Sequence, residues 1–296
     1  MSLENQIKAA ISRRTSARTT DTTVCRLVNG AGDGLDELVV DDFGGRWLMS
    51  INEGRTTPQL SAELGYRMLY AKTWSKNQTN APWYVAGEEL NGRFAVKEQG
   101  LSYWIDFQSG YSQGLFLDQR LNRARLREVC PGKTVLNTFA YTCSFGLAAT
   151  SAGAKTVNLD LSRNYLDWGQ ENYRLNGIEP DQTDFIYGDV FDWLARFAKR
   201  GRRFDIVVLD PPTFSRSRTS GVFQAEQDYG ALLERALRVV EPNGILLCCL
   251  NTHQVSAAQF RYILKNGLPS PANLRQAPMP PDFPGSDYLK SFWVFL

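Results

Sequence analysis

Three aspartates follow short apolar runs that are expected to be buried strands. Asp160, Asp189 and Asp210 each stand within two residues of the end of such a run. The carboxyl ends of parallel strands meet at one edge of a sheet, where open α/β folds bind their ligands. The three carboxylates are therefore expected to face a common site.

The segment before Asp160 indicates the kind of ligand. Residues 134–136 are expected to form a strand, 137–142 a tight loop, and Ser144 the cap of the helix that follows. The loop has no glycine, whereas a dinucleotide-binding loop needs bare backbone close to a pyrophosphate. It fits a ribose-bearing cofactor without phosphates, of which S-adenosylmethionine (SAM) is the common one. An ordinary α/β crossover with a chance acid is the alternative, and the missing glycines argue against a nicotinamide-dependent dehydrogenase.

Asp210 opens the stretch Asp-Pro-Pro-Thr-Phe, which ends at Phe214. Proline fixes its backbone and has no N–H, so the neighbouring carbonyls are left as acceptors. Together with the Asp210 carboxylate they suit the amino-bearing edge of a nucleobase, and Phe214 suits stacking on its ring. The alternative is a rigid loop with a helix-capping acid.

Two patterns of elements surround these residues. From Lys133 onward apolar strands alternate with helices, which predicts an α/β fold with a parallel sheet covered on both faces. Ser162 and Ser256 are expected to cap two of these helices, and another helix is expected to begin at Asp228. Residues 24–107 instead predict several strands, including a hairpin across Gly44-Gly45 and a pair turning at Gln99-Gly100, and one helix from Thr57-Pro58 to about Trp74. We expect a basic N-terminal arm at 1–23 with a helix at 4–18, a small α+β domain at 24–107 and the α/β domain at 108–296.

The composition limits the function classes. The chain has 296 residues, 43% of them hydrophobic and 22% charged, with a formal net charge of +2. Its five cysteines show neither metal-ligand spacing nor a disulfide framework, and the single His253 argues against a Ser/His/Asp triad. Neither a signal peptide nor a membrane span is evident. We expect a cytoplasmic protein with reduced thiols, no metal and no membrane contact, either a monomer or a homodimer.

Residues 26–296 resemble the class I SAM-dependent methyltransferases that modify bases of bacterial large-subunit (23S) ribosomal RNA, of the methyltransferase I and K type. The matching stretches run in order through both expected domains: Arg26-Leu-Val-Asn-Gly30 with Asp33-Gly34, Val40-Asp41, Gly114-Leu-Phe-Leu-Asp-Gln-Arg120, Val135-Leu-Asn-Thr-Phe-Ala-Tyr-Thr142, Asp160-Leu-Ser162, Asp210-Pro-Pro-Thr-Phe-Ser215 and Tyr288-Leu-Lys290. The resemblance implies a Rossmann-like, seven-stranded methyltransferase domain preceded by a small α+β domain, with SAM as cofactor and RNA as partner.

The resemblance also implies roles for individual positions. The first strand and its loop would line the methionine side of SAM, the acid after the second strand would hold the ribose, and the acid after the third strand would hold the adenine amino group. Asp210 would lie between SAM and the target base. The implied cofactor-binding residues are Arg120, Asn137, Thr138, Phe139, Asp160, Leu161, Asp189, Val190 and Asp210.

One departure from the family concerns the grip on RNA. Many members carry an N-terminal PUA domain, and about 25 residues before Arg26 are too few for one. Basic side chains elsewhere would then hold the phosphate backbone. The candidates are Arg13, Arg14, Arg18, Arg123, Arg127, Lys199, Arg200, Arg202, Arg203, Arg216 and Arg218.

A second departure concerns the reaction. Members that methylate carbon-5 of cytosine attack the ring with a thiolate, and their cysteine lies where this chain has Asn251. Members that methylate a guanine ring nitrogen carry asparagine there and need no covalent step. We therefore expect a non-covalent reaction, with Asp210, Phe214 and Asn251 around the base. The alternatives are cytosine methylation by Cys249, and a module that binds SAM and RNA in ribosome assembly without catalysis.

Overall fold

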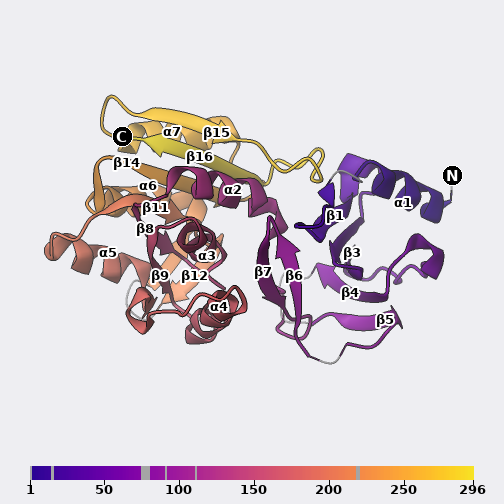
Figure 1. Ribbon diagram of the computed structural model, residues 1–296. Helices are drawn as coiled ribbons and strands as arrows, with labels where there is room; N and C mark the ends of the chain where they lie inside the picture. The colour runs from indigo at the N-terminus through magenta and orange to yellow at the C-terminus, as the bar shows by residue number, and fades with distance from the viewer. Residues whose placement is uncertain (1, 15–16, 75–80, 91, 111, 218–220) are drawn as a thin grey trace. The chain divides into compact units, whose positions relative to one another are not determined.

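The computed structural model describes residues 2–14, 17–74, 81–90, 92–110, 112–217 and 221–296 (Figure 1). Contacts within the chain divide it into two compact units. The first unit comprises residues 1–120 and 279–286, and the second comprises residues 121–278 and 287–296. The helices of the described residues include none long and apolar enough to cross a membrane.

The first unit is built on a five-stranded sheet. Its strands, in spatial and chain order, are β1 (Val24–Asn29), β2 (Leu38–Phe43), β3 (Arg46–Asn52), β4 (Met68–Trp74) and β5 (Trp83–Gly87). The predicted hairpin is present: β2 and β3 are antiparallel, and Gly44 and Gly45 between them have φ of 71° and 85°, values that glycine adopts without a Cβ penalty. Strands β6 (Phe94–Glu98) and β7 (Leu101–Ile105) form a separate antiparallel pair, as their turn at Gln99-Gly100 predicted.

The helix predicted from residue 57 to residue 74 is wrong. Only a short 3-10 turn, η3 (Ala62–Leu64), forms there, and Gly65 ends it with a φ of 94°. The rest is β4, which pairs in parallel with β3. The first four residues of β4 are all buried, so both faces of the strand are covered and the spacing of apolar residues matched a helix by coincidence.

The N-terminal segment contributes to the core of the first unit. The helix α1 (Leu3–Ser12) begins at the cap Ser2, and it is shorter than the expected helix at 4–18. Its Ile7 and Ala10 are fully buried and pack in the same cluster as residues of β1 to β4. We expected residues 1–23 to be an arm, and this helix instead packs on the sheet.

A segment from near the C-terminus completes the first unit. Asp282 is 1% exposed, and it accepts hydrogen bonds from the Arg26 backbone N–H at 2.9 Å and from the Arg120 guanidinium. The Asn29 amide donates to the Pro284 carbonyl at 2.7 Å. Residues 279–286 therefore supply a buried carboxylate that two arginines of the first 120 residues need.

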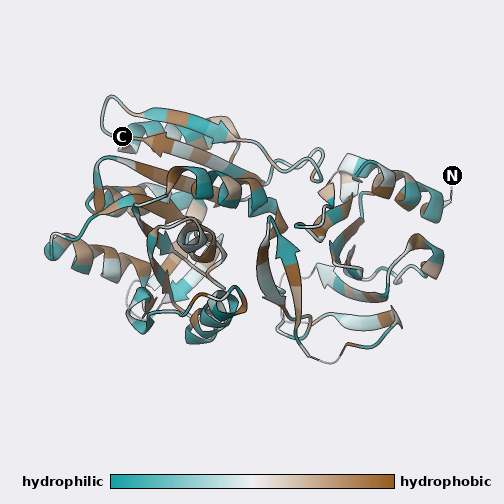
Figure 2. Cartoon of the chain, viewed as in Figure 1, coloured by the Kyte–Doolittle hydropathy of each residue, from teal (hydrophilic) through white to brown (hydrophobic). Residues whose placement is uncertain are grey.

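The second unit contains a seven-stranded sheet. Its spatial order is β10-β9-β8-β11-β14-β16-β15, with β16 antiparallel to both of its neighbours. The strands are β8 (Thr134–Thr138), β9 (Lys155–Asp160), β10 (Phe185–Tyr187), β11 (Phe204–Leu209), β14 (Val240–Asn251), β15 (Asn273–Ala277) and β16 (Leu289–Phe295). Figure 2 shows apolar residues concentrated along the middle strands of this sheet. The predicted Rossmann-like α/β fold is confirmed.

Helices connect these strands. They are α2 (Arg120–Val129), α3 (Ser144–Ser151), α4 (Arg163–Leu175), α5 (Val190–Lys199), α6 (Ala225–Leu237) and α7 (Ala257–Gly267). Buried residues of α5, α6 and α7 form one hydrophobic cluster with the sheet, while α3 and α4 contact β8, β9 and β10. Ser162 caps α4 and Ser256 caps α7, both as predicted.

One hairpin was not predicted. Directly after the Asp-Pro-Pro stretch, β12 (Phe214–Ser217) pairs antiparallel with β13 (Gly221–Gln224). Arg218, one of the expected RNA contacts, lies outside the described residues. The helix α6 begins directly after β13, three residues before the position expected from the sequence.

Candidate functional site

The loop between β8 and α3 is strained. Phe139, Tyr141 and Cys143 have φ of 53°, 49° and 60°, a region that residues with a side chain rarely adopt. Each such residue costs on the order of 1–3 kcal/mol and persists where the surroundings hold it. The predicted cap of α3 is wrong by one residue: Cys143 occupies the N-cap, without a side-chain hydrogen bond, because its left-handed backbone turns the chain into the helix. Strain of this kind clusters at ligand sites.

A buried polar network lies beneath this loop. The Asn137 amide donates to Asn158 Oδ1 at 2.9 Å, and the Asn158 amide donates to the Tyr173 hydroxyl at 3.1 Å. Thr138 Oγ1 donates to the Val208 carbonyl at 2.6 Å, which joins β8 to β11. Asn137 and Thr138 are 1% and 0% exposed, so their side chains fix the end of β8 from inside. Their predicted role on the methionine side of SAM stays a prediction.

Gly146 makes the network possible. A Cβ on Gly146 would lie 2.0 Å from Asn158 Oδ1, a distance at which atoms overlap. Gly146 is the third residue of α3, so its missing side chain lets this helix approach β9 closely enough for Asn158 to reach Asn137. The glycine that the site requires is thus in the helix after the loop.

Asp160 is held with both carboxylate oxygens defined. Oδ2 accepts from the Tyr141 backbone N–H and Oδ1 from the Ser162 backbone N–H, both at 2.8 Å. Burial raises the pKa of Asp160, while the N–H groups of Tyr141, Ser162 and Leu161 oppose the rise. The oriented carboxylate retains lone pairs that suit a diol such as ribose. Leu161 beside it is 42% exposed, an apolar side chain left at the strand end.

Asp189 has a structural task, and its predicted contact with the adenine amino group stays a prediction. Its Oδ1 accepts from the backbone N–H of Phe191 at 2.9 Å and of Asp192 at 3.3 Å, and so caps α5. Val190 is 4% exposed and belongs to the hydrophobic core, so its side chain serves packing. Tyr187, the last residue of the strand β10 that leads to Asp189, is 51% exposed.

The structure brings the Asp210–Phe214 stretch next to the end of β14. Thr213 Oγ1 donates to the Asn251 carbonyl at 2.8 Å. Asn251 is the last residue of β14 and is exposed, and Phe214 is 56% exposed. The strand β11 that delivers Asp210 lies between β8 and β14 in the sheet. The predicted base-side residues therefore gather at the same strand ends as the strained loop.

Lys290 is a buried residue near the end of β14 for which no role was predicted. Its ammonium donates to the carbonyls of Thr252 and Tyr288, and the residue is 4% exposed. Thr252 also donates from Oγ1 to Glu226 Oε1 at 2.5 Å. Burial lowers the pKa of Lys290, while Asp287 and Glu226 oppose that effect. Lys290 thus fixes the turn that follows Asn251, and its place in the Tyr288-Leu-Lys290 match was the available signal.

The two cysteines near Asn251 are enclosed. Cys248 and Cys249 are both 0% exposed, and burial raises the pKa of the Cys248 thiol to about 12. Cys249 Sγ lies 3.5 Å from Ser291 Oγ on β16. A nucleophilic cysteine needs access and a lowered pKa, and these surroundings provide neither access at Cys249 nor a lowered pKa at Cys248.

Arg120 is occupied within the first unit. Its guanidinium binds Asp282 and donates to the Val24 carbonyl at 3.3 Å, and the residue is 6% exposed. These contacts explain its burial, and its predicted part in cofactor binding stays a prediction.

The basic candidates lie in several parts of the chain, and among them Arg123 on α2 is buried at 2% exposure. Arg13 and Arg14 bind Asp33, and Arg18 binds Asp42, so these guanidiniums have internal partners. Residues 199–203 lie between the end of α5 and the start of β11, at the amino end of that strand. Arg216 stands on β12, beyond the carboxyl end of β11, and is exposed.

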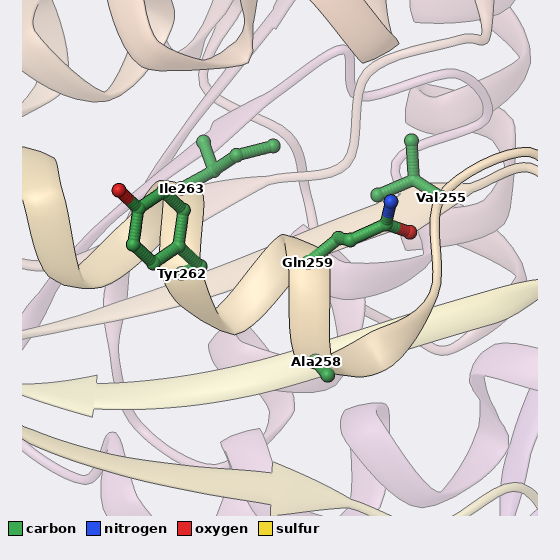
Figure 3. Close-up of a pocket in the computed structure, with 5 residues that line it drawn as sticks. All are labelled: Val255, Ala258, Gln259, Tyr262 and Ile263. Carbon is green, nitrogen blue, oxygen red and sulfur yellow. The ribbon is translucent and has the colours of Figure 1, made fainter.

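A hollow along the helix α7 differs from the strand-end site in the residues that line it (Figure 3). Val255, Ala258, Gln259, Tyr262 and Ile263 line it, and none of them is charged. It contains none of the acids at the strand ends, so it does not supply the chemistry of the site.

Comparison with known proteins identifies the family. A family model described as S-adenosylmethionine-dependent methyltransferase matches residues 47–295. The putative ribosomal RNA large subunit methyltransferase YwbD of Bacillus subtilis is 33% identical over 275 residues, which are 88% of this chain and 68% of the relative. Ribosomal RNA large subunit methyltransferase K of Neisseria meningitidis is 39% identical over 155 residues, which are 52% of this chain and 44% of the relative. The chain thus spans less than half the length of that second relative.

A solved structure agrees with both. SMU.776, a putative methyltransferase in complex with S-adenosylhomocysteine (SAH), has a TM-score of 0.86 and 26% identity, and the match covers 100% of this chain and 83% of that one. The strained loop, the oriented Asp160 and the exposed Leu161 fit a ribose-bearing ligand without phosphates. The chain belongs to the family of S-adenosylmethionine-dependent methyltransferases, and SAM is its cofactor.

Proposed function

We propose that this protein methylates a base of RNA, and that the RNA is large-subunit ribosomal RNA. The observation that carries the proposal is that Phe214 and Asn251 lie near each other at the strand ends, linked by the hydrogen bond from Thr213 to Asn251. An exposed aromatic ring and an amide suit a nucleobase. The names of the relatives from Bacillus subtilis and Neisseria meningitidis support ribosomal RNA as the substrate class.

Within this proposal the residues of the chain position the cofactor and the base. Bound SAM supplies an electrophilic methyl group on a positively charged sulfur. Asp160 accepts hydrogen bonds from the ribose, and the strained backbone from Phe139 to Cys143 surrounds the methionine part. Phe214 stacks on the base, while Asp210 and Asn251 hold its polar edge. Such positioning contributes up to about 7–11 kcal/mol to the lowering of a barrier.

We further propose that the reaction is non-covalent and that the target is a guanine ring nitrogen. A ring nitrogen would bond to the methyl carbon through its own lone pair, and the electrons of the broken carbon–sulfur bond would stay on sulfur. The positive charge of the sulfonium would pass to the base, which releases it as a proton where that nitrogen carries one. The burial of Cys249 and the presence of Asn251 at the strand end support this mechanism over attack by a thiolate.

Transfer of labelled methyl from SAM to ribosomal RNA of a strain lacking this gene tests the proposal, with the product nucleoside identified by mass spectrometry. A methylated guanosine is expected. Asn251→Ala should lower the rate on the order of tenfold to a hundredfold, because the base loses a positioning group. Cys249→Ala should retain methyl transfer.

Other results separate the alternatives. A 5-methylcytidine product, lost in Cys249→Ala, would replace the guanine mechanism with the covalent one. Incorporation into another RNA class would refute the ribosomal assignment alone. Binding of SAM and RNA without any incorporation would favour the assembly module.

A further inference from the structure

The hairpin β12–β13 separates exposed from buried side chains by strand face. Phe214 and Arg216 alternate with Ser215 on β12, and their cross-strand partners are Gln224 and Val222. All four are exposed, with Phe214 at 56% and Val222 at 46%. Alternate residues of a strand point to one face, so the four side chains share a face of the hairpin.

The opposite face anchors the hairpin to the second unit. Phe223 is 5% exposed, and its ring stacks on Phe139 with centroids 6.1 Å apart and also contacts Phe191. At the base of the hairpin the Ala225 N–H donates to the Thr213 carbonyl at 3.0 Å. The hairpin is therefore joined at one side to the strained cofactor loop and at its start to the residue that binds Asn251.

The exposed face has a consistent chemistry. Residues 214–224 contain two arginines and no aspartate or glutamate. The face combines an aromatic ring, an aliphatic side chain, a guanidinium and an amide. Single-stranded nucleic acids are bound by this combination, because bases stack on rings and on guanidinium planes while phosphates pair with positive charge.

We propose that the exposed face of the β12–β13 hairpin binds the single-stranded RNA segment next to the target base, with Arg216 at a phosphate and Val222 under a base or ribose. This rests on the proposed function, which supplies RNA as the substrate. The continuity of the hairpin with the Asp210–Phe214 stretch places this segment directly beside the base that Phe214 stacks on. A protein partner is disfavoured by the small area of four side chains on two four-residue strands.

Binding of a fluorescent single-stranded fragment of the substrate RNA to the SAH-bound protein tests this, measured by anisotropy at several salt concentrations. Arg216→Gln should weaken binding several-fold and reduce the slope of log affinity against log salt by about 0.7, the value for one phosphate on a single strand. Val222→Ser should weaken binding about threefold to tenfold without changing the slope, because it removes apolar contact only. The matched control is Arg238→Gln at the C-cap of α6, an exposed arginine paired with Glu234 and placed outside this face.

The outcomes are distinct. Parent-like binding by both hairpin variants, or an equal loss in Arg238→Gln, would overturn the inference while leaving the proposed function intact. Weaker binding in the hairpin variants together with no methyl transfer by the parent would retain the RNA-binding face and refute the proposed reaction. Unchanged SAH affinity in all three variants, from calorimetry, shows that the protein is folded. Failure of the parent to bind any RNA would overturn both.

Discussion

Gly146→Ala is the sharpest test of how the cofactor loop is supported. In most helices alanine is preferred to glycine by up to about 1 kcal/mol. Here the new methyl group would lie 2.0 Å from Asn158 Oδ1 and 2.8 Å from Nδ2, and Asn158 is 0% exposed. The helix α3 must then shift away from β9, and the displaced Asn158 amide loses its hydrogen bond with Asn137.

The sizes of these effects decide whether Gly146→Ala stabilises or destabilises the protein. Overpacking of a core costs about 1–3 kcal/mol. A buried amide that loses its partner adds roughly 1–3 kcal/mol. The two costs add in this case, and the higher helix propensity of alanine offsets about 1 kcal/mol of them. The free energy of unfolding should therefore fall by about 1–5 kcal/mol. The affinity for SAH should also fall, because Asn137 lies at the start of the loop that we propose to surround the cofactor.

Gly230→Ala is the matched control. Gly230 lies inside α6, is exposed, and a Cβ there would meet no atom within 4 Å. It should stabilise the protein by about 0.5–1 kcal/mol and leave SAH binding unchanged. Thermal unfolding with and without SAH, together with calorimetric titration of SAH, measures both effects, at about 2–4 °C per kcal/mol for a unit of this size. If Gly146→Ala melts at or above the parent temperature and binds SAH equally well, the close approach of α3 to Asn158 is not a constraint and the reasoning fails.

Three further predictions concern single carboxylates and one buried lysine. Burial raises the pKa of Asp42 from 3.8 to about 6, so the folded protein disfavours the ionised carboxylate and loses stability as the pH rises through this window. The free energy of unfolding of Asp42→Asn, measured in urea, should therefore rise by up to about 3 kcal/mol relative to that of the parent between pH 4 and pH 7. A difference that stays constant with pH would contradict this. Lys290→Met should lower kcat by on the order of tenfold to a hundredfold with the KM for SAM little changed, because the turn after Asn251 loses the ammonium that holds it. Lys265→Met, a change at an exposed position on α7, should behave like the parent. Equal effects of the two substitutions would count against a positioning role for Lys290. Asp160→Asn should weaken SAH binding by about tenfold or more, because an amide cannot accept hydrogen bonds from both the Tyr141 and the Ser162 N–H groups. An unchanged dissociation constant in calorimetry would remove Asp160 from the site.

The predictable features were those fixed by local chemistry. The acids at strand ends, the caps Ser162 and Ser256, and the alternation of strands with helices each depend on a few neighbouring residues, and the seven-stranded sheet has them as expected. The resemblance to methyltransferases added the number of strands and the preceding small α+β domain. These signals survive because a strand end or an N-cap is decided within about one helical turn.

The failures came from long-range partners. Residues 68–74 became β4 because β3, some 20 residues earlier, offered a pairing edge that periodicity does not show. The requirement for glycine at position 146 in α3 was not predicted, because only the approach of Asn158 reveals it. The burial of Cys249 against Ser291 likewise depends on β16, 42 residues away in sequence.

The order in which a ribosome makes this chain has a consequence for its folding. Arg26 and Arg120 emerge early, whereas Asp282, their common buried partner, is synthesised after nearly the whole polypeptide. A nascent chain of the first 120 residues would therefore lack the acceptor for the Arg26 backbone N–H and the carboxylate that pairs with the Arg120 guanidinium. We expect the N-terminal unit to reach its native state only post-translationally, in contrast to the usual order in which the leading domain folds first. A gene fragment that encodes residues 1–120 alone should accordingly yield an insoluble or molten product.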